Sequence, residues 1–573
     1  MSGADPRGQR VILGIVKVLL RALVFLWLAG AVSPGQSSLM GIASEELDRN
    51  FRILKEKTDP PPYFLAYEIT ENESNQIAAT LGAITSTGNG KSRVLDTSVR
   101  VGTPKLDNYH RVRGERAQFT SGAAIPLDDN PAAIQRRMWL ETDRAYRSAA
   151  ERLIKIRTNT QVNVAAEDPS DDFSQEQPSV HSELPPALRF DAADWTKRVR
   201  QLSLAFKAHT AILTSSVSVA AQRESRYFVN TEGARVEHGR GFARVIIVAH
   251  GRAADGMNLT TATSFDALDA ASLPANDVLL AAVEQVAKDL EGLLEAPVVE
   301  PFLGPAIFSG RAAGVFFHEI FGHRIEGHRQ KDEAEGQTFT RSVGSAVLPE
   351  FLSVIFDPTR RKVGTVDLNG WFTFDDEGMP ARRIAAVENG VLKTFLMSRS
   401  PIKGFDHSNG HGRRQPGLEV VSRQSNLLVE SSRTVPEARL REMLIDEIKR
   451  QNKPYGLYFR EVTGGFTTTA RAGLQAFKVL PLVVFRVYAD GRPDELVRGA
   501  DIVGTPLSSF AKILATSDRL EVFNGYCGAE SGSVPVSAVA PAILLSEIEI
   551  EKRDKSQDRP PLMPPPTDSG ASR

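Results

Sequence analysis

The sequence predicts an α+β protein of two domains: an N-terminal domain with a mixed α/β sheet and a C-terminal, antiparallel β-rich domain of barrel-like form. Segments with the alternating pattern of half-buried strands are interspersed with helical patterns, and strand-like segments dominate after Ala296-Pro297. The chain of 573 residues is long enough for two or more domains, each with a core of its own. We therefore expect domains at residues 38–297 and 298–551.

The composition is that of an ordinary globular protein with balanced charge. Lys and Arg total 69 and Asp and Glu total 70, and the hydrophobic content is 41%. The net charge of −1 argues against a protein that binds nucleic acid electrostatically. The single cysteine, Cys527, cannot form an intramolecular disulfide, so it is either a small buried side chain, a nucleophile or a metal ligand.

Residues 1–33 have the pattern of an export signal. A basic leader ending at Arg21 is followed by an apolar run, and Ala29-Gly30-Ala31 is a small-x-small site suited to a signal peptidase. Lys17 and Arg21 interrupt the apolar stretch 11–32, which favours a cleaved signal peptide over a signal anchor. We expect export to the periplasm, with membrane anchoring by residues 11–32 as the alternative.

The N-terminal domain is expected to contain four helices and several short strands. The helical patterns cover 38–57, 131–156, 195–206 and 277–294, and the strand patterns cover 63–70, 76–86, 91–102, 211–222, 225–229, 234–238 and 243–251. The segment 162–184 is polar, acidic and rich in Pro and Ser, and predicts a mobile surface loop.

The C-terminal domain is expected to be mostly strands. They fall at 353–356, 383–388, 391–397, 456–462, 477–487 and 542–549, with helices at 436–451 and 506–514. The tail 552–573 consists of Pro, Ser and charged residues, and predicts disorder.

The stretch 315–329 carries the main candidate site. His318 and Glu319 are adjacent, and His323 follows five residues after the first histidine. Neutral imidazoles are good zinc ligands, and a carboxylate beside a metal-bound water is a good general base. The stretch therefore predicts a zinc site on a helix for which Ser309 is the expected N-cap.

The motif is one residue longer than the H-E-x-x-H pattern of many zinc peptidases. In a regular helix, side chains at i and i+4 are roughly 40° apart around the axis, whereas those at i and i+5 are roughly 140° apart. His318 and His323 therefore converge only if the helix is locally unwound. We expect a π-bulge, for which Gly322 supplies the backbone tolerance.

A water-activating zinc site usually has three protein ligands and an open position. The third ligand could be Glu326, which is three residues after His323, or His328. Cys527 is another candidate, because it lies in the segment Asn524-Gly-Tyr-Cys-Gly528, whose glycines permit a close approach of the backbone. The residues alone leave this choice open.

Several motifs together resemble the TldD/PmbA family of metallopeptidases. The resemblance covers essentially all of residues 300–550, and in the N-terminal half it holds in outline. The matching stretches are His318-Glu-Ile-Phe-Gly-His323 with Glu326-Gly327, Phe374-Asp-Asp-Glu-Gly378, Glu388-Asn-Gly-Val-Leu-Lys393, Gly410-His-Gly-Arg-Arg414, Val497-Arg-Gly-Ala500, and Cys527-Gly528 with Ser533-Val-Pro-Val536.

The resemblance implies a zinc peptidase that hydrolyses unfolded or flexible peptides. It implies one Zn²⁺ per chain held by His318, His323 and Cys527, with Glu319 as the base that activates the zinc-bound water. It also implies a dimer, formed with an identical chain or with a degenerate paralogue, that encloses the peptide substrate. The export signal departs from the family, whose best-known members are cytoplasmic. Since a thiolate ligand makes zinc a weaker Lewis acid, we expect slow turnover.

Other motifs are candidates for substrate binding or have structural explanations. Arg413 and Arg414 could clamp a peptide by charge-assisted hydrogen bonds, and Gly464 and Gly465 could belong to an edge strand that pairs with an extended peptide. The acidic run 375–377 lacks the spacing of a calcium loop and predicts a solvated turn. The alternative to an enzyme is a non-catalytic, peptide-binding scaffold subunit of a TldD/PmbA-type dimer.

Overall fold

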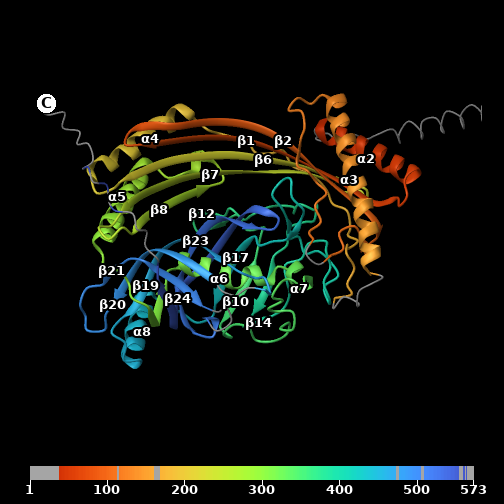
Figure 1. Cartoon of the computed structure of the whole chain (residues 1–573). Helices are drawn as coiled ribbons and strands as arrows, with labels where there is room; N and C mark the ends of the chain where they lie inside the picture. Colours follow the sequence, from red (N-terminus) through yellow and green to blue (C-terminus); the bar gives the residue numbers. More distant parts are fainter. Residues whose placement is uncertain are drawn as a thin grey trace, which may run out of the picture.

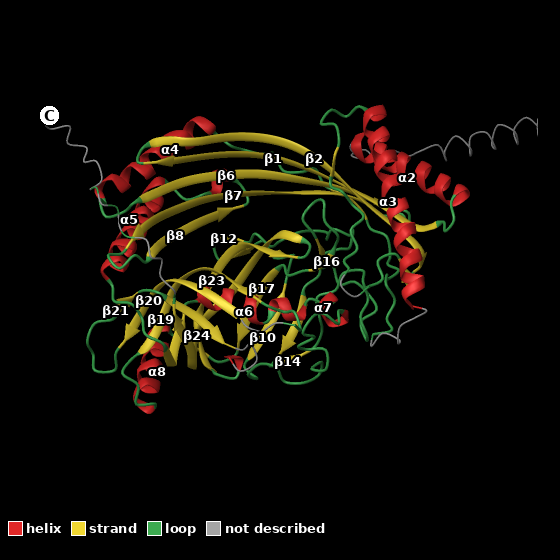
Figure 2. Ribbon diagram, in the orientation of Figure 1, coloured by secondary structure: helices red, strands yellow, loops and turns green. Residues whose placement is uncertain are grey.

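The computed structural model describes residues 38–112, 115–160, 168–472, 477–504 and 509–553, with Arg559, Pro561 and Met563. The expected export signal, residues 1–33, lies outside the described residues, as does most of the expected disordered tail. Within the described ranges, no helix is both long and apolar enough to span a bilayer. Figures 1 and 2 show a long, curved N-terminal sheet that arches over a β-rich C-terminal part.

The N-terminal sheet is built from two long antiparallel hairpins. Its eight strands run in the order β3-β2-β1-β6-β7-β5, with β4 beside β2 and β8 beside β7. The strands are β1 (Pro62–Thr80), β2 (Ala83–Thr103), β3 (Leu106–Asp107), β4 (Ala123–Ala124), β5 (Val180–Ser182), β6 (Thr214–Asn230), β7 (Arg235–Arg252) and β8 (Asn258–Ala267).

The sequence patterns underestimate the length of these strands. The segments expected as three strands over 63–102 form one hairpin, in which Leu81 and Gly82 make the turn with positive φ angles of 48° and 85°. Glycines and polar residues in the middle of β2 interrupt the alternating pattern, but the strand continues because β1 supplies its ladder of hydrogen bonds.

Among the described residues, helices cover both ends of this sheet and leave its middle without a helical layer (Figure 1). At one end, α2 (Ser38–Lys57) and α3 (Pro131–Thr160) pack on β1 and β2 around an apolar core that includes Leu47, Leu95 and Met138. At the other end, α4 (Ala192–Leu204) and α5 (Asn276–Glu295) enclose a second core that includes Val245 and Leu290. The short 3₁₀ helices η1 (Ala205–Ala208) and η2 (Ala270–Ser272) adjoin this end.

The C-terminal part contains a closed five-stranded barrel, which confirms the expected barrel-like form. Its strands pair in the circle β9-β24-β22-β20-β19 and back to β9, and β17, β10, β13 and β14 extend the sheet outward from β24. The β19–β9 and β17–β24 ladders are parallel, so the sheet is mixed rather than wholly antiparallel.

The barrel strands are β9 (Phe302–Phe308), β19 (Gly456–Thr467), β20 (Phe477–Val487), β22 (Ala500–Gly504) and β24 (Gly532–Lys552). The extension comprises β10 (Leu352–Phe356), β13 (Ile384–Glu388), β14 (Val391–Leu392) and β17 (Asn426–Ser431). The remaining strands are β11 (Lys362–Val363), β12 (Val366–Asp367), β15 (Gly412–Arg413), β16 (Val421–Ser422), β18 (Thr434–Val435), β21 (Glu495–Val497) and β23 (Ile513–Ala529).

The helices of this part that lie wholly within the described residues are α6 (Gly310–Ile320), η3 (Gly322–Ile325), α7 (His328–Lys331) and α8 (Glu437–Arg450), and Ser509 and Phe510 are helical as well. Helix α6 lies against β24, β19 and β23 and contributes Phe316 and Phe317 to the largest apolar core. The expected helix over 506–514 is wrong at its end, because Ile513 already begins β23; residues 505–508 lie outside the described residues.

Within the described part of the expected mobile loop, residues 168–184, the segment 172–174 is packed against the protein, whereas Val180 and Leu184 are exposed. Phe173 is 3% exposed and lies under the guanidinium of Arg399, 4.0 Å from the ring centre. The backbone N–H of Ser174 donates to the carbonyl of Arg399 at 2.8 Å. An aromatic anchor therefore holds 172–174 in place, although the composition of this segment predicts a mobile surface loop, and the residues that follow lie at the surface as expected.

Candidate metal centre

Helix α6 positions the first histidine and the glutamate. The Ser309 side chain caps its N-terminus by accepting from the N–H of Ala312 at 3.2 Å, and nearly every residue that follows is buried. The helix ends at Ile320, so His318 and Glu319 stand in its last turn. His323 lies on the separate 3₁₀ turn η3.

The expected π-bulge is therefore wrong. The backbone brings the histidines together by ending the α-helix at Ile320 and continuing after Phe321 as a 3₁₀ turn, which changes the direction of the chain between them. Gly322 serves close packing at this break, because a Cβ atom there would lie 1.9 Å from Oε1 of Gln424. Gln424 in turn donates to the carbonyl of His318 at 3.3 Å.

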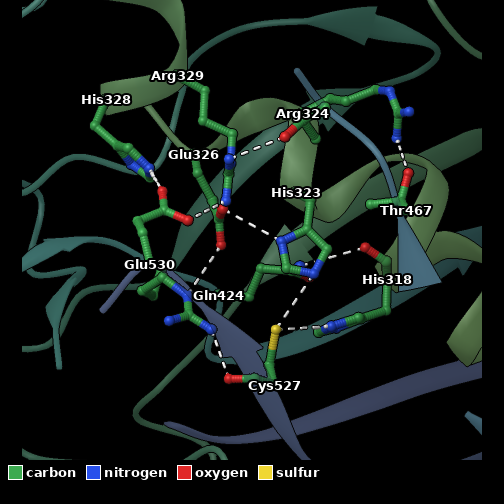
Figure 3. A network of polar contacts seen from close by, with 12 residues as sticks. His318, His323, Arg324, Glu326, His328, Arg329, Gln424, Thr467, Cys527 and Glu530 are labelled. Carbon is green, nitrogen blue, oxygen red and sulfur yellow. Dashed lines mark hydrogen bonds and ion pairs between the residues drawn. The ribbon is translucent and has the colours of Figure 1, made fainter. Parts of the chain in front are cut away.

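The structure brings His318, His323 and Cys527 together. The Cys527 Sγ atom, on β23, lies 3.2 Å from Nε2 of His318 and 3.3 Å from Nε2 of His323. One ligand atom from each residue lies within 4.8 Å of the others, and the three side chains point toward one another (Figure 3). All three residues are buried.

These donors fit a zinc ion. Tetrahedral coordination, with Zn–S of about 2.3 Å and Zn–N of about 2.0–2.1 Å, separates the sulfur and nitrogen atoms by roughly 3.5 Å. The observed separations of 3.2 and 3.3 Å are close to this value. Two imidazoles and a thiol are also a donor set that zinc accepts, and three protein ligands leave a fourth position open.

Electrostatics favour a thiolate at this point. Burial alone would raise the pKa of Cys527, but the imidazoles of His323 and His318 outweigh it and hold that pKa well below its ordinary value. For His323, burial opposes protonation, whereas the thiolate and Glu326 raise its pKa well above the ordinary value. Without a metal, the Cys527 thiolate is thus paired with a protonated imidazole. A bound metal cation would replace the imidazole proton and balance the same negative charge.

Glu319 lies beside the cluster in a tightly shaped space. Its side chain is 6% exposed, and burial raises its pKa, partly offset by His318 and His323. Gly465 on β19 packs directly against it: a Cβ at this position would lie 2.7 Å from Cγ of Glu319 and 2.8 Å from the carbonyl of Lys478. The predicted Gly464-Gly465 segment therefore lines the site, and Gly465 is the residue that makes room for the carboxylate.

Glu326 supports His323 from behind. It is fully buried, and its Oε2 atom lies 3.3 Å from Nδ1 of His323, on the opposite side of the ring from Cys527. Although burial alone would raise the pKa of Glu326, His323 and two arginines lower it to about 2, so the carboxyl group is ionised. Such a carboxylate fixes the histidine tautomer that presents Nε2 to a metal.

Two buried arginines join Glu326 to the strand that carries the cysteine. Arg423 Nε lies 3.4 Å from Glu326, and its Nη2 donates to the carbonyl of Cys527 at 2.6 Å. Arg329 donates to Glu326 at 2.9 Å and to Glu530 at 2.8 Å. Glu530 also contacts His328, which is therefore a buried supporting residue and lies outside the ligand cluster (Figure 3).

The cluster opens into a cavity of about 770 Å³ between the two sheets. Its walls include the segment 463–470 on one side and β23 with Phe523 and Tyr526 on another, and the N-terminal sheet covers it with Arg244, Ile246 and Thr263. Arg324 connects helix α6 to the end of β19 beside the cavity. Its guanidinium donates to the Glu319 carbonyl at 3.0 Å and to the Thr467 hydroxyl at 2.9 Å.

Arg413 and Arg414 do not line this cavity. Arg414 donates to Glu68 of β1 at 2.7 Å, with both side chains 2% exposed, and so joins the C-terminal part to the N-terminal sheet. Arg413 donates to the carbonyls of Gln424 and Pro535 at 2.6 and 2.8 Å, and burial lowers its pKa to about 9. Their prediction as substrate clamps is replaced by a structural role.

The acidic run 375–377 is likewise buried rather than solvated. Asp375 accepts from the N–H groups of Glu377, Met379 and Gly412, and Asp376 pairs with Arg226 of β6. Arg329, Arg423, Gln424 and Glu530 were not identified from the sequence as site residues. They act through contacts between segments far apart in the chain, and no local spacing reveals such contacts.

Comparison with known proteins places the C-terminal part in a defined family. Residues 304–552 match the model of the PmbA/TldA metallopeptidase C-terminal domain. A metalloprotease of Methanocaldococcus jannaschii is 29% identical over 233 residues, 40% of this chain and 47% of that protein, so the chain spans about half the length of this relative. A metalloprotease of Methanothermobacter thermautotrophicus is 24% identical over 465 residues, 79% of this chain and 94% of that protein.

Two further comparisons bear on the metal and the fold. A protein of Saccharolobus solfataricus named zinc metalloprotease TldD homolog is 24% identical over 249 residues, 43% of this chain and 51% of that protein. The crystal structure of TldE from Thermococcus kodakarensis superimposes with a TM-score of 0.58 and 14% identity, and it covers 90% of this chain and all of that one. The family model over residues 304–552 and the curated relatives, together with the shared fold, support a member of the TldD/PmbA family.

Proposed function

We propose that the protein is a zinc-dependent peptidase that hydrolyses unfolded or flexible peptides. The observation that carries this proposal is the convergence of His318, His323 and Cys527, with Glu319 beside them, at the wall of a 770 Å³ cavity. A purely structural zinc normally has four protein ligands, whereas this cluster offers three and faces open space.

Zinc is the metal that the donor set and the name of the Saccharolobus relative favour. Held by His318, His323 and Cys527, it would supply a Lewis acid that polarises a carbonyl and lowers the pKa of water. Glu326 would keep His323 in the required tautomer, and Arg423 would hold the Cys527 segment by its backbone carbonyl.

Glu319 is the proposed general base. It would take the proton from the attacking water and later deliver it to the amine of the departing peptide. A Cβ atom at Gly465 would lie 2.7 Å from Cγ of Glu319 and 2.8 Å from the carbonyl oxygen of Lys478, so the glycine at this position leaves room for the Glu319 side chain beside the cluster. This close packing limits the positions that the carboxylate can take beside the cluster.

The shape of the cavity favours extended chains over folded proteins. It lies between the two sheets, and its lining combines exposed aromatic side chains, Phe466 and Tyr526, with the backbone of a glycine-rich strand. Apolar surface together with accessible backbone groups suits a peptide of varied sequence. A folded domain could not place a peptide bond next to the buried Glu319.

The test begins with metal stoichiometry on the wild type, His323→Ala and Cys527→Ala. We expect about one zinc per wild-type chain and loss of zinc in both variants. The wild type should then cleave casein, and Glu319→Gln should keep its zinc but lose cleavage. A wild type that takes up no zinc on reconstitution, or a Glu319→Gln variant that cleaves normally, would overturn the proposal. Peptide binding without cleavage would favour the non-catalytic scaffold instead.

A further inference from the structure

A second cavity adjoins the 770 Å³ cavity next to His318, His323 and Cys527, which is named the metal cavity below. It measures about 320 Å³ and lies between α5 and β8 of the N-terminal part and β19 and β20 of the barrel. Three residues, Ala262, Thr263 and Leu482, line both cavities, so the two spaces share a wall. In Figure 1, α5 and β8 lie above β19, β20 and β21 at one end of the molecule.

An ion pair marks the boundary between the two spaces. Arg311, the first residue after the start of α6, lines the metal cavity, and Glu461 lines the second cavity. Nε of Arg311 donates to Glu461 at 3.2 Å, and Nη1 donates to the carbonyl of Val522 at 2.9 Å. The same α-helix that carries His318 and Glu319 thus holds the arginine at this boundary.

A second ion pair belongs to the far wall. Arg460 of β19 pairs with Asp289 of α5, and Gln285 donates to the other Asp289 oxygen at 2.8 Å. Ala282, Gln285 and Asp289 follow one another at helical spacing, so one face of α5 forms this wall. Both ion pairs are neutral overall, and apart from Gln285 the uncharged lining is threonine, alanine, leucine and valine.

From this arrangement we infer that the second cavity is a subsite of the peptidase. It takes the stretch of peptide on one side of the scissile bond and prefers uncharged side chains there. Its volume lies within the range of ligand pockets, and its shared wall gives a bound chain a continuous path from Glu319. Each charged residue on the wall is already paired with an opposite charge. A charged peptide side chain that entered the cavity would lose its hydration and would find no free opposite charge to compensate for that loss. This inference rests on the proposed function.

The first experiment fills the cavity. Ala282 is partly exposed and faces the cavity, whereas its neighbour Ala281 is exposed and does not line it. Ala282→Phe should therefore shift the bonds cleaved in oxidised insulin B chain, as mapped by mass spectrometry, and Ala281→Phe should leave the pattern unchanged. Zinc content should equal that of the wild type in both variants, since neither residue contacts the metal cluster.

The second experiment reverses the charge preference. Arg460→Leu leaves the Asp289 carboxylate unpaired and should create a preference for Lys or Arg in the peptide. Asp289→Asn leaves Arg460 unpaired and should create a preference for Asp or Glu. We expect at least tenfold opposite changes in kcat/KM across fluorogenic peptides that carry a neutral, basic or acidic residue at each position. If a substitution acted only through loss of packing, kcat/KM would change in the same direction for all three kinds of peptide.

A binding measurement separates the subsite from catalysis. Each substitution is combined with Glu319→Gln, and the affinity for fluorescein-labelled neutral, basic and acidic peptides is measured by anisotropy. The same opposite preferences should appear without turnover. If the wild type cleaves peptides but all these variants match it in cleaved bonds, charge preference and affinity, the subsite is wrong and the peptidase stands. If the wild type neither binds zinc nor cleaves peptides, the peptidase and the subsite both fail.

Discussion

Glu326 and Cys527 face opposite nitrogens of the same imidazole: Oε2 of Glu326 is 3.3 Å from Nδ1 of His323, and Sγ of Cys527 is 3.3 Å from Nε2. The ring is thus held from behind by a carboxylate while its other nitrogen is presented to the cluster. Carboxylates placed in this way raise the basicity of a ligating histidine and fix its orientation. Among the supporting residues, Glu326 is therefore the one whose replacement should lower the zinc affinity most directly.

Glu326→Gln should weaken zinc binding by about 10- to 100-fold, because the neutral amide neither fixes the tautomer nor balances the imidazole as a carboxylate does. Competition against a fluorescent zinc chelator measures this change. Glu335→Gln is the matched control, since Glu335 also binds Arg329, at 3.0 Å, but does not contact His323. Equal zinc affinity in the two variants would contradict the role of Glu326.

Gly465→Ala should abolish most peptidase activity while zinc remains bound. The added methyl group would lie 2.7 Å from Cγ of Glu319, and the Lys478 carbonyl on its other side prevents it from moving away. The carboxylate must then shift, and a misplaced general base lowers kcat more than it raises KM. At Gly528, next to Cys527, a Cβ meets nothing within 4 Å, so Gly528→Ala should retain activity.

Glu68→Gln should destabilise the protein by about 3–5 kcal/mol, as measured by the denaturation midpoint. Glu68 is 2% exposed and lies between Arg414 Nη2 at 2.7 Å and Arg226 Nη1 at 2.8 Å, so its loss leaves two buried cations short of a partner. The exposed pair Arg439–Glu442, at 2.8 Å, provides the comparison. Glu442→Gln should change stability by less than about 1 kcal/mol.

Stability should fall as the pH is lowered through the range below about 6.5. Burial lowers the pKa of His411 to about 3, and it lowers the pKa of His238 to about 4. A histidine with a depressed pKa in the folded state contributes stability that is complete above its unfolded pKa and is lost as the pH falls toward its folded pKa. Each histidine should therefore remove about 1.4 kcal/mol per pH unit in this window.

The measurement is the denaturation midpoint between pH 4 and 7 for the wild type and His411→Gln. The variant should be less stable at pH 7, because His411 has polar contacts to Ser425 and Asn409, but its pH dependence should be shallower. A variant with the same slope as the wild type would show that His411 does not take up a proton on unfolding.

The sequence predicted the site better where its signal was local. His318, Glu319 and His323 stand within six residues, and their chemistry was evident from residue type and spacing. Cys527 remained one of three alternatives until the resemblance to the family selected it, because the sulfur reaches the histidines across 204 residues of chain. The error over the π-bulge has the same origin: the contact of Gln424 against Gly322 belongs to the tertiary packing at the break between α6 and η3.

The sequence patterns also predicted the fold class and the positions of helices such as α2, but they did not predict the length of the strands. Helix α2 occupies 38–57 as its apolar periodicity predicts. The long hairpins exceed the patterns that mark them, since pairing between strands carries β2 through its run of small and polar residues. Arg413 and Arg414 were misjudged because a glycine-flanked arginine resembles a surface clamp in sequence, whereas only packing reveals that Glu68 lies against Arg414.

The separation of the ligands along the chain has a consequence for biosynthesis. His318 and His323 leave the ribosome before Cys527, which follows 209 and 204 residues later and is held by pairing between β23 and β24. The strand β24 also closes the barrel. A nascent chain therefore acquires all three proposed zinc ligands at the same stage as its last barrel strand, so we expect zinc binding to follow the folding of this half rather than to guide its first steps.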